Sequence, residues 1–170
     1  MKIQILALLI LLITGHGMHA STHDSLFWAV MGSDEEKVER LIAGGADVNR
    51  QDRHGTTPLH VAAKFGNRKL TELLLAAGAN VNLQNNCEET ALHNAAQSNE
   101  EDVIQLLLDA NAEINKQNCF GDTPLHYASQ WKKIKAVQFL IAAGADTEII
   151  NHGGYTAEQS ITHNDIITLK

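Results

Sequence analysis

The sequence of residues 52–84 reads DRHGTTPLHVAAKFGNRKLTELLLAAGANVNLQ, and the rest of the chain is built from this unit. Its tetrapeptide TPLH, at 57–60, returns as TALH at 90–93, as TPLH at 123–126 and as TAEQ at 156–159. The three offsets between these segments are equal, and we call this offset the repeat length. Equal spacing without an insertion predicts stacked supersecondary units that share a continuous core, and it argues against one irregular core.

The unit also carries a fixed set of small and turn-forming residues. Gly55 precedes the TPLH segment, an alanine pair follows at 62–63, and the sequence GANVN at 78–82 closes the unit. In these features the chain from about Thr22 onward resembles the ankyrin-repeat proteins. The resemblance implies an all-α fold, an ankyrin-repeat solenoid of stacked helix-turn-helix units with projecting β-hairpin loops. It implies little about function, because one scaffold can carry many unrelated binding tasks.

The period divides the chain into repeats. We expect one ankyrin-repeat domain over residues 21–170, with repeats at about 21–51, 52–84, 85–117 and 118–150 and a partial cap at 151–170. The first repeat lacks TPLH, and Asp24 or Ser25 is expected to cap its first helix. Its second helix, expected from about Asp34 to Ala43, has polar Lys37 and Arg40 where repeat two has leucines, which is typical of an end cap.

Three turn positions depart from the repeat pattern. Glu88 replaces the turn glycine of repeat two, and Asn111 replaces its helix-ending glycine. Asn adopts the left-handed conformation readily and Glu does not, so we expect local loosening at Glu88. Lys132 stands where repeat two has Gly66 and repeat three has Asn99, which predicts backbone strain at this inner turn.

The first 20 residues differ in composition from the repeats. Lys2 gives a positive start, residues 3–13 form an apolar run, and Gly17 and Ala20 mark two candidate cleavage points. This pattern predicts a signal peptide over residues 1–20, and therefore a mature chain that is secreted or periplasmic. The apolar run is shorter than the ~20 residues that span a bilayer, so no stable membrane anchor is expected after its removal. An uncleaved anchor or a buried N-terminal helix is the alternative.

The charge balance bears on the class of partner. The formal net charge is −7, and the chain without its first 20 residues holds 20 acidic and 12 basic residues. An acidic surface repels phosphate backbones, so a nucleic-acid partner is not expected. Lys132, Lys133 and Lys135 form a short basic run, which we interpret as the solvated start of a helix. We expect a protein as partner and a monomer as the state of the chain.

The recurring histidines are the first candidates for chemistry. His60, His93 and His126 occupy one repeat position, and the family resemblance implies that each hydrogen-bonds within its turn and to the next repeat. Neighbouring repeats stack ~10 Å apart, too far for these rings to share one zinc ion at about 2 Å. No nucleophile elbow or phosphate loop is present. We expect no enzyme activity, no cofactor and no metal site; the alternative is a cell-envelope enzyme or metal-handling protein with a site between repeats.

The two cysteines both fall on projecting loops. Repeat register pairs Cys87 with Phe120, so Cys119 is one residue short of the equivalent position. Equivalent positions in adjacent repeats lie too far apart for a disulfide, whose Cα separation is usually below ~6.8 Å. The one-residue offset could remove or increase that difficulty, and an oxidising compartment would permit the bond, so pairing stays open.

The resemblance places the binding surface on the loop tips and on the exposed side of the first helices. From these positions we predict a partner-binding set of Arg53, His54, Lys64, Phe65, Glu89, Gln97, Phe120, Asp122, Gln130, Trp131 and Tyr155. Exposed aromatic residues are the usual anchors of protein interfaces, so Trp131 is the leading candidate. Tyr127 lies one register toward the core, and we expect it to stabilise the stack.

Overall fold

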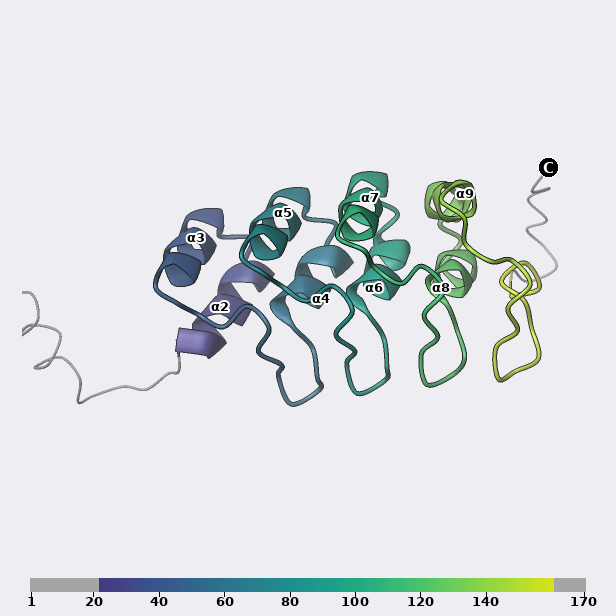
Figure 1. The fold of residues 1–170 in the computed structure, drawn as a ribbon, viewed down its shortest axis with the longest axis horizontal. Helices are drawn as coiled ribbons and strands as arrows, with labels where there is room; N and C mark the ends of the chain where they lie inside the picture. The colour runs from purple at the N-terminus through teal and green to yellow at the C-terminus, as the bar shows by residue number, and fades with distance from the viewer. Residues whose placement is uncertain (1–21, 161–170) are drawn as a thin grey trace, which may run out of the picture.

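The computed structural model describes residues 22–160 as two parallel rows of helices with loops projecting from one of them (Figure 1). The inner row consists of α2 (Thr22–Met31), α4 (Pro58–Lys64), α6 (Ala91–Ser98) and α8 (Pro124–Gln130). The outer row consists of α3 (Glu35–Ala43), α5 (Arg68–Ala76), α7 (Glu101–Asp109) and α9 (Ile134–Ala142). The predicted signal peptide and the end of the predicted cap, 161–170, lie outside the described residues.

The expected all-α solenoid is confirmed, but the projecting loops are held differently from a β-ladder. Residues 22–160 contain no strand, although the loops have the outline of hairpins in Figure 1. In every loop one side-chain oxygen accepts from the backbone N–H groups two and four residues later, at 2.8–3.1 Å. These residues are Asp52, Asn85, Asn118 and Asn151. Such Asx turns shape a loop without the pairing of strands.

Left-handed backbone recurs at three places in each repeat. Every residue of positive φ within 22–160 lies in one of three sets whose members are one repeat length apart. The inner turns hold Ser33, Gly66, Asn99 and Lys132; the outer helices end on Gly45, Gly78, Asn111 and Gly144; and the loops hold Gly55, Glu88, Gly121 and Gly154. The left-handed conformation that underlies the strain predicted at Lys132 is confirmed, with a φ of 53°, and Glu88 is left-handed as well, with a φ of 59°.

The loop at Glu88 has the same hydrogen bonds as the loop at Gly55. Glu88 N–H donates to the Asn85 carbonyl at 2.8 Å, as Gly55 N–H does to Asp52 at 3.0 Å. The Gln84 amide also donates to the Glu88 carbonyl at 2.7 Å. The surrounding hydrogen bonds therefore hold this residue in its unfavourable conformation, and the strain is kept instead of being released.

Each TPLH segment starts an inner helix through a cap that its histidine completes. At α4, Thr57 N–H donates to His60 Nδ1 at 3.2 Å, and His60 N–H donates to Thr57 Oγ1 at 3.4 Å. Because Nδ1 accepts, the proton of the neutral ring sits on Nε2, which donates to the Glu89 carbonyl of the next repeat at 2.9 Å. His93 and His126 repeat this geometry, so the expected structural role is confirmed.

The last repeat keeps the cap with a different residue. Thr156 N–H donates to Gln159 Oε1 at 3.0 Å, and Gln159 N–H donates to Thr156 Oγ1 at 3.4 Å. A glutamine three residues after threonine is a standard partner in a capping box. The TAEQ segment thus preserves the local geometry that the histidine provides in the other repeats.

The core lies between the two rows and ends at the first repeat. Leu59, Leu92 and Leu125 of the inner row are at most 2% exposed. At the N-terminal end, Lys37 and Arg40 of α3 are exposed, as expected for an end cap, and Asp34 caps α3 by accepting from Lys37 N–H at 3.0 Å. The predicted cap of the preceding helix is wrong, since Asp24 and Ser25 lie inside α2, which begins at Thr22.

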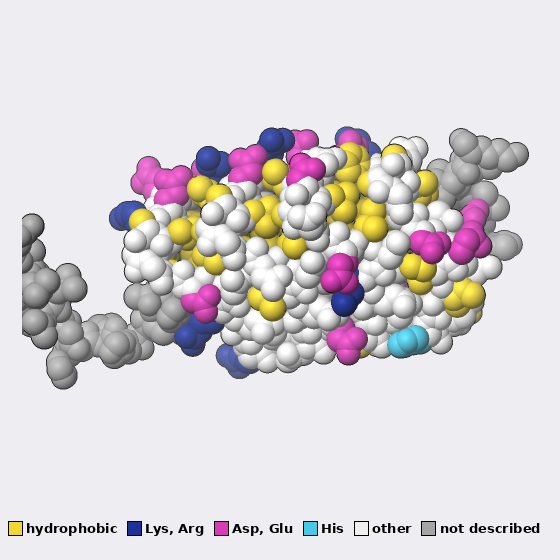
Figure 2. Space-filling model, viewed as in Figure 1, with side chains coloured by type: hydrophobic (Ala, Val, Ile, Leu, Met, Phe, Trp, Pro, Cys, Tyr) yellow, Lys and Arg dark blue, Asp and Glu magenta, His cyan; other side chains and the backbone are white. Residues whose placement is uncertain are grey.

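Links between repeats gather on the loop side. The Asn49, Asn82 and Asn115 side chains bond the backbone about one repeat ahead, for example through Asn82 Nδ2 to the Asn111 carbonyl at 3.1 Å. Between described outer helices the one ion pair is Arg68 with Asp102, at 3.1 Å. Figure 2 accordingly shows charged side chains along the outer-helix edge, above apolar side chains that lie in the grooves.

Replacing Glu88 with glycine should stabilise the protein by about 1 kcal/mol, because glycine adopts positive φ without a clash between Cβ and the carbonyl oxygen. Chemical denaturation of both proteins measures the difference. The matched control is Glu88→Ala, which removes the carboxylate but keeps a Cβ and should leave stability within about 0.5 kcal/mol. An equal gain in the two variants would assign the effect to charge.

The stability of the fold should fall as the pH drops from about 6.5 to about 4. Burial lowers the pKa of His93 to about 4, against 6.5 for an unperturbed ring, so the unfolded chain takes up the proton first. The free energy of unfolding should then decrease by roughly 3 kcal/mol over this window from His93 alone. His93→Gln, which copies Gln159, should reduce the slope in urea titrations at several pH values. An unchanged slope would exclude His93 as its source.

Candidate partner-binding surface

Three large apolar side chains stand exposed at the ends of inner helices. Met31 ends α2, and Phe65 and Trp131 are the C-cap residues of α4 and α8. Their exposed fractions are 42%, 59% and 54%. Phe65 and Trp131 occupy the same repeat position two units apart, and Ser98 stands between them in repeat three. Phe65 and Trp131 therefore lie on a line that follows the stacking direction, and Met31, in register with Lys64, adjoins its N-terminal end.

The backbone beneath these side chains is fixed. Phe65 N–H donates to the Val61 carbonyl at 3.1 Å, and Trp131 N–H donates to the Tyr127 carbonyl at 3.0 Å. The next residue in each case, Gly66 or Lys132, is left-handed and turns the chain toward the outer helix. A bulky residue at the helix end is thus held outward by the turn that follows it, which is the arrangement of a pre-organised contact residue.

The loops add a second line of exposed side chains. Phe120 and Tyr155 are 60% and 55% exposed, and Arg53 and His54 are also exposed. On the inner helices, Lys64 and Gln130 are exposed and Gln97 is half-buried. We call the surface formed by Met31, Lys64, Phe65, Trp131 and the exposed loop residues Arg53, His54, Phe120 and Tyr155 the inner face.

Two residues of the predicted partner-binding set, Asp122 and Glu89, hydrogen-bond to neighbouring residues of the repeat stack instead. Asp122 is only 7% exposed, and its carboxylate accepts from Asn151 Nδ2 at 2.7 Å, so the expectation that it is displayed is wrong. The half-buried Glu89 carboxylate accepts from Asn85 Nδ2 at 2.7 Å and from the Tyr127 hydroxyl. Both residues precede the threonine of a capping box, where the chain is pressed against the preceding repeat.

Tyr127 packs where the sequence predicted it, inside the stack. Its ring meets His93 edge-to-face with centroids 5.3 Å apart, and Asn118 Nδ2 lies 3.3 Å from its hydroxyl oxygen. Burial and then the hydrogen bond to Glu89 raise the pKa of the Tyr127 hydroxyl. The hydroxyl therefore keeps its proton and donates it to the Glu89 carboxylate, which satisfies the hydrogen-bonding needs of both groups.

A pocket of about 240 Å³ lies at the N-terminal end of the inner face. Its apolar walls come from Phe27, Met31, Val61 and Phe65, and Lys64 stands at its side. The polar residues that complete it are Thr56, His60, Asn85, Glu89 and Asn94. Apolar walls with a few polar groups are the usual lining of a site that receives a side chain or a small ligand.

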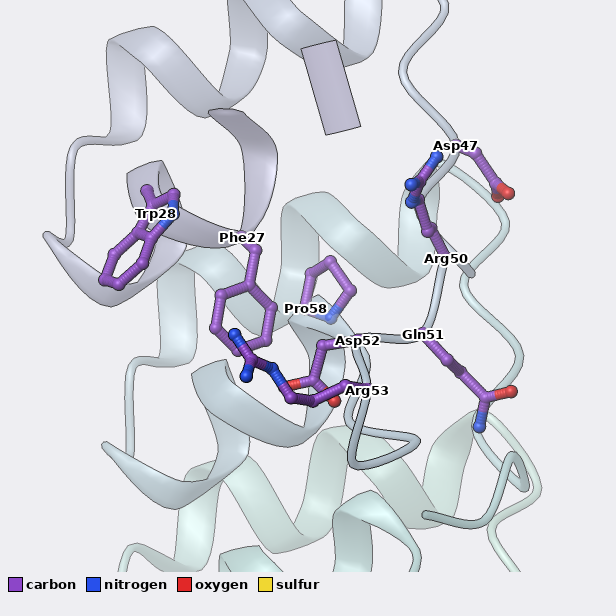
Figure 3. A pocket seen from close by; sticks show the side chains of 8 residues that line it. All are labelled: Phe27, Trp28, Asp47, Arg50, Gln51, Asp52, Arg53 and Pro58. Atoms are coloured by element: carbon purple, nitrogen blue, oxygen red, sulfur yellow. The ribbon is translucent and has the colours of Figure 1, made fainter. Parts of the chain in front are cut away.

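A neighbouring pocket of about 370 Å³ was missed by the sequence analysis. Phe27 and Pro58 line it together with Arg53, and Figure 3 shows these three side chains on one side of it, with Asp47 and Arg50 at the other end. Trp28 also lines this pocket, is 64% exposed, and meets the Phe27 ring edge-to-face at 6.3 Å.

Alignment of the first repeat with the second would have predicted that Trp28 is exposed. Trp28 stands one repeat length before Val61, which is 6% exposed because α2 covers it, whereas the first repeat has no described repeat before it. The reasoning that predicted exposed Lys37 and Arg40 in α3 applies equally to α2. Applied there, it would have placed Trp28 and Met31 at the surface.

The N-terminal part of the inner face carries charges of both signs. Arg53 and Lys64 are exposed and form no ion pair with the residues whose side chains are described, 26–160. The acidic groups nearby are Asp52, which lines a pocket with Arg53, and Glu89, whose carboxylate accepts from two uncharged donors. Arg53 and Lys64 are thus the cations that this region offers to a ligand, within a chain whose formal net charge is −7.

The described residues offer no cluster for metal chemistry. No group of three or more His, Cys, Asp or Glu side chains within this part of the chain is arranged to hold a metal ion. Both nitrogens of each recurring histidine ring take part in the cap or in the link to the next repeat. Among the described helices, none is long and apolar enough to cross a membrane.

Comparison with known proteins agrees with the repeat geometry. A sequence model described as ankyrin repeats (3 copies) matches residues 3–85 and 68–151. Myotrophin of Xenopus laevis is 42% identical over 43 residues, which are 25% of this chain and 36% of myotrophin. The chain matches about a third of the length of that relative. The family matches cover well over half of the chain, and the protein therefore belongs to the ankyrin-repeat family.

Proposed function

We propose that this protein is a non-catalytic binding module that holds a protein partner on its inner face, outside the cytosol. Ankyrin repeats are generally protein–protein interaction modules. The observation that carries the proposal is the set of Met31, Phe65 and Trp131, each at least 42% exposed and each at the end of an inner helix. Large apolar side chains held in the open are costly in water and are the common anchors of interfaces.

The chemistry of the inner face suggests the kind of partner surface it fits. The pocket between Met31 and Phe65 would receive an apolar side chain of the partner. The exposed Arg53 and Lys64 beside it would favour carboxylates around that side chain and would steer an acidic partner toward this end. An apolar anchor flanked by acidic residues is therefore the partner feature we propose.

The proposed location depends on the first 20 residues. The positive start at Lys2, the apolar run 3–13 and the small residues Gly17 and Ala20 support export by a signal peptide. Export to the periplasm or the extracellular space would place the inner face among partners of that compartment. We propose a secreted or periplasmic protein on this basis.

Trp131→Ala should weaken binding of the partner about 10-fold or more while the midpoint of thermal unfolding changes little, because this side chain is 54% exposed. The partner would be captured from periplasmic or culture extract with the full chain, identified by mass spectrometry, and titrated against purified variants by calorimetry. Phe65→Ala provides a second test on the same line of side chains.

Gln138→Ala is the matched control for this measurement. Gln138 is exposed on α9 in the outer row, so its removal should leave both affinity and stability unchanged. Equal losses of binding in the Gln138 and Trp131 variants would place the interface elsewhere. Loss of binding by Trp131→Ala in parallel with a large loss of stability would show that the side chain serves the fold.

Export should yield a mature chain that starts at Met18 or Ser21, following cleavage after Gly17 or Ala20. Expression of the full chain in a bacterial host, fractionation, and N-terminal sequencing of the exported protein measure this. The double variant Leu8→Arg/Leu9→Arg interrupts the apolar run and should retain the protein in the cytosol. A full-length chain starting at Met1 in every fraction would contradict the proposed signal peptide.

A further inference from the structure

Neighbouring loops are joined by a hydrogen bond that is out of repeat register by one residue. Asn86 N–H donates to the His54 carbonyl at 2.9 Å, and His152 N–H donates to the Phe120 carbonyl at 2.9 Å. The two members of each pair are closer in sequence than the repeat length by a single residue. The third bond of this series runs from Cys119 N–H to the Cys87 carbonyl, at 3.0 Å. The two cysteines thus occupy the pair of positions that this backbone bond joins between loops three and four.

The backbone bond brings these residues within reach of a disulfide. With standard backbone dimensions, a 3.0 Å bond from Cys119 N to the Cys87 carbonyl oxygen keeps the two Cα atoms within about 6.9 Å, close to the range of about 4.4–6.8 Å that disulfides need. The Cys87 and Cys119 thiols are both exposed and reduced in this structure. They lie close enough for Cys87 to be among the groups that raise the pKa of Cys119.

We propose that Cys87 and Cys119 are a disulfide site, which closes when the protein meets a small-molecule or protein disulfide and joins the loops of repeats three and four. The thiolate of one cysteine attacks a sulfur atom of the oxidant, forms a mixed disulfide and releases one reduced thiol. The second cysteine then attacks the bonded cysteine and releases the other reduced thiol. Two electrons and two protons pass to the oxidant, and one intramolecular S–S bond forms.

The surroundings of the pair suit a structural bond. Desolvation at the loop contact raises the pKa of the Cys119 thiol first, and the neighbouring Cys87 thiol and Glu88 carboxylate raise it further. A thiol of raised pKa is a poor nucleophile at neutral pH, unlike the activated thiols of redox enzymes. Closure should therefore be slow at neutral pH and faster at higher pH, and the product should persist.

The bond would enclose the whole of α6 and α7 in one covalent loop. Cross-linking a loop of roughly 33 residues removes much of the freedom of the unfolded chain. It would also fix the position of Phe120, the residue after Cys119, relative to the preceding loop. This inference goes beyond the proposed function, because it holds whether or not the inner face binds a partner.

The test compares reduced protein with protein equilibrated with oxidised glutathione. The oxidised monomer should be lighter by two hydrogen atoms, should resist alkylation at both cysteines, and should unfold roughly 5–10 °C higher. Cys87→Ser and Cys119→Ser should instead give mixed disulfides with glutathione. Reduction of the wild type should restore alkylation and the lower midpoint.

A control variant, here called the register control, moves the second cysteine by one residue. It distinguishes disulfide formation that depends on the loop contact from the general reactivity of exposed thiols. In Cys119→Ser/Phe120→Cys the second thiol moves to the repeat-equivalent position, out of the loop–loop pairing, and an intramolecular bond should form more than about 10-fold more slowly. Wild-type protein that gives only mixed disulfides or a cross-linked dimer would overturn the proposal. Closure at the same rate in the register control would overturn it as well.

Discussion

Each repeat that carries a TPLH or TALH segment depends on the next repeat for one hydrogen bond that it cannot make alone. The ring of His60 accepts at Nδ1 within its own cap, which leaves its Nε2 proton to be satisfied elsewhere. The carbonyl that accepts it belongs to Glu89 of the following repeat, and the ring is almost fully buried. A buried donor without an acceptor costs about 1–3 kcal/mol, so an isolated repeat would lose both its apolar contacts and this bond. The same residue thus begins a helix and requires the next repeat.

This requirement explains why the polar residues of the stack are so regular. The loops carry an Asx side chain once in every repeat, and the inner helices of the later repeats start on threonine at the same interval. Carboxylates where two repeats meet also take part in hydrogen bonds between repeats, as the Glu89 carboxylate does with the Tyr127 hydroxyl. Exposed side chains outside these hydrogen bonds, such as Phe65 and Trp131, are the part of the structure that varies from one repeat to the next.

The repeat length determined most of the fold in advance. Helix positions and the left-handed residue Asn111 follow from alignment of the repeats, because local conformation is set by residues within one unit. The structural role of the histidines was implied by the resemblance to ankyrin-repeat proteins. The start of α2 was misplaced because the first repeat lacks the threonine that marks a helix start elsewhere. Strands were expected in the loops, but Asx turns give the same outline without a ladder.

The surface was harder to predict than the frame. Alignment says which positions face a neighbour, but it does not reveal which polar side chains find partners there. Asp122 looked accessible by position, yet Asn151 of the following repeat covers it, at a distance in sequence that no local pattern reveals. Trp28 was overlooked because its aligned counterpart Val61 is buried. The one-residue slip between loops that joins Cys87 to Cys119 depends on how the loops lean, which only coordinates give.

The uneven distribution of links between repeats has a mechanical consequence. The loop side is joined repeatedly by hydrogen bonds such as Gln51 Nε2 to the Gln84 carbonyl at 2.8 Å, whereas the described outer helices meet through apolar contacts and the exposed pair of Arg68 and Asp102. An exposed ion pair offers little resistance to stretching. The solenoid should therefore behave like a strip that is stiff along one edge and elastic along the other. Its curvature can change by fanning of the outer helices while the spacing of the loops stays constant.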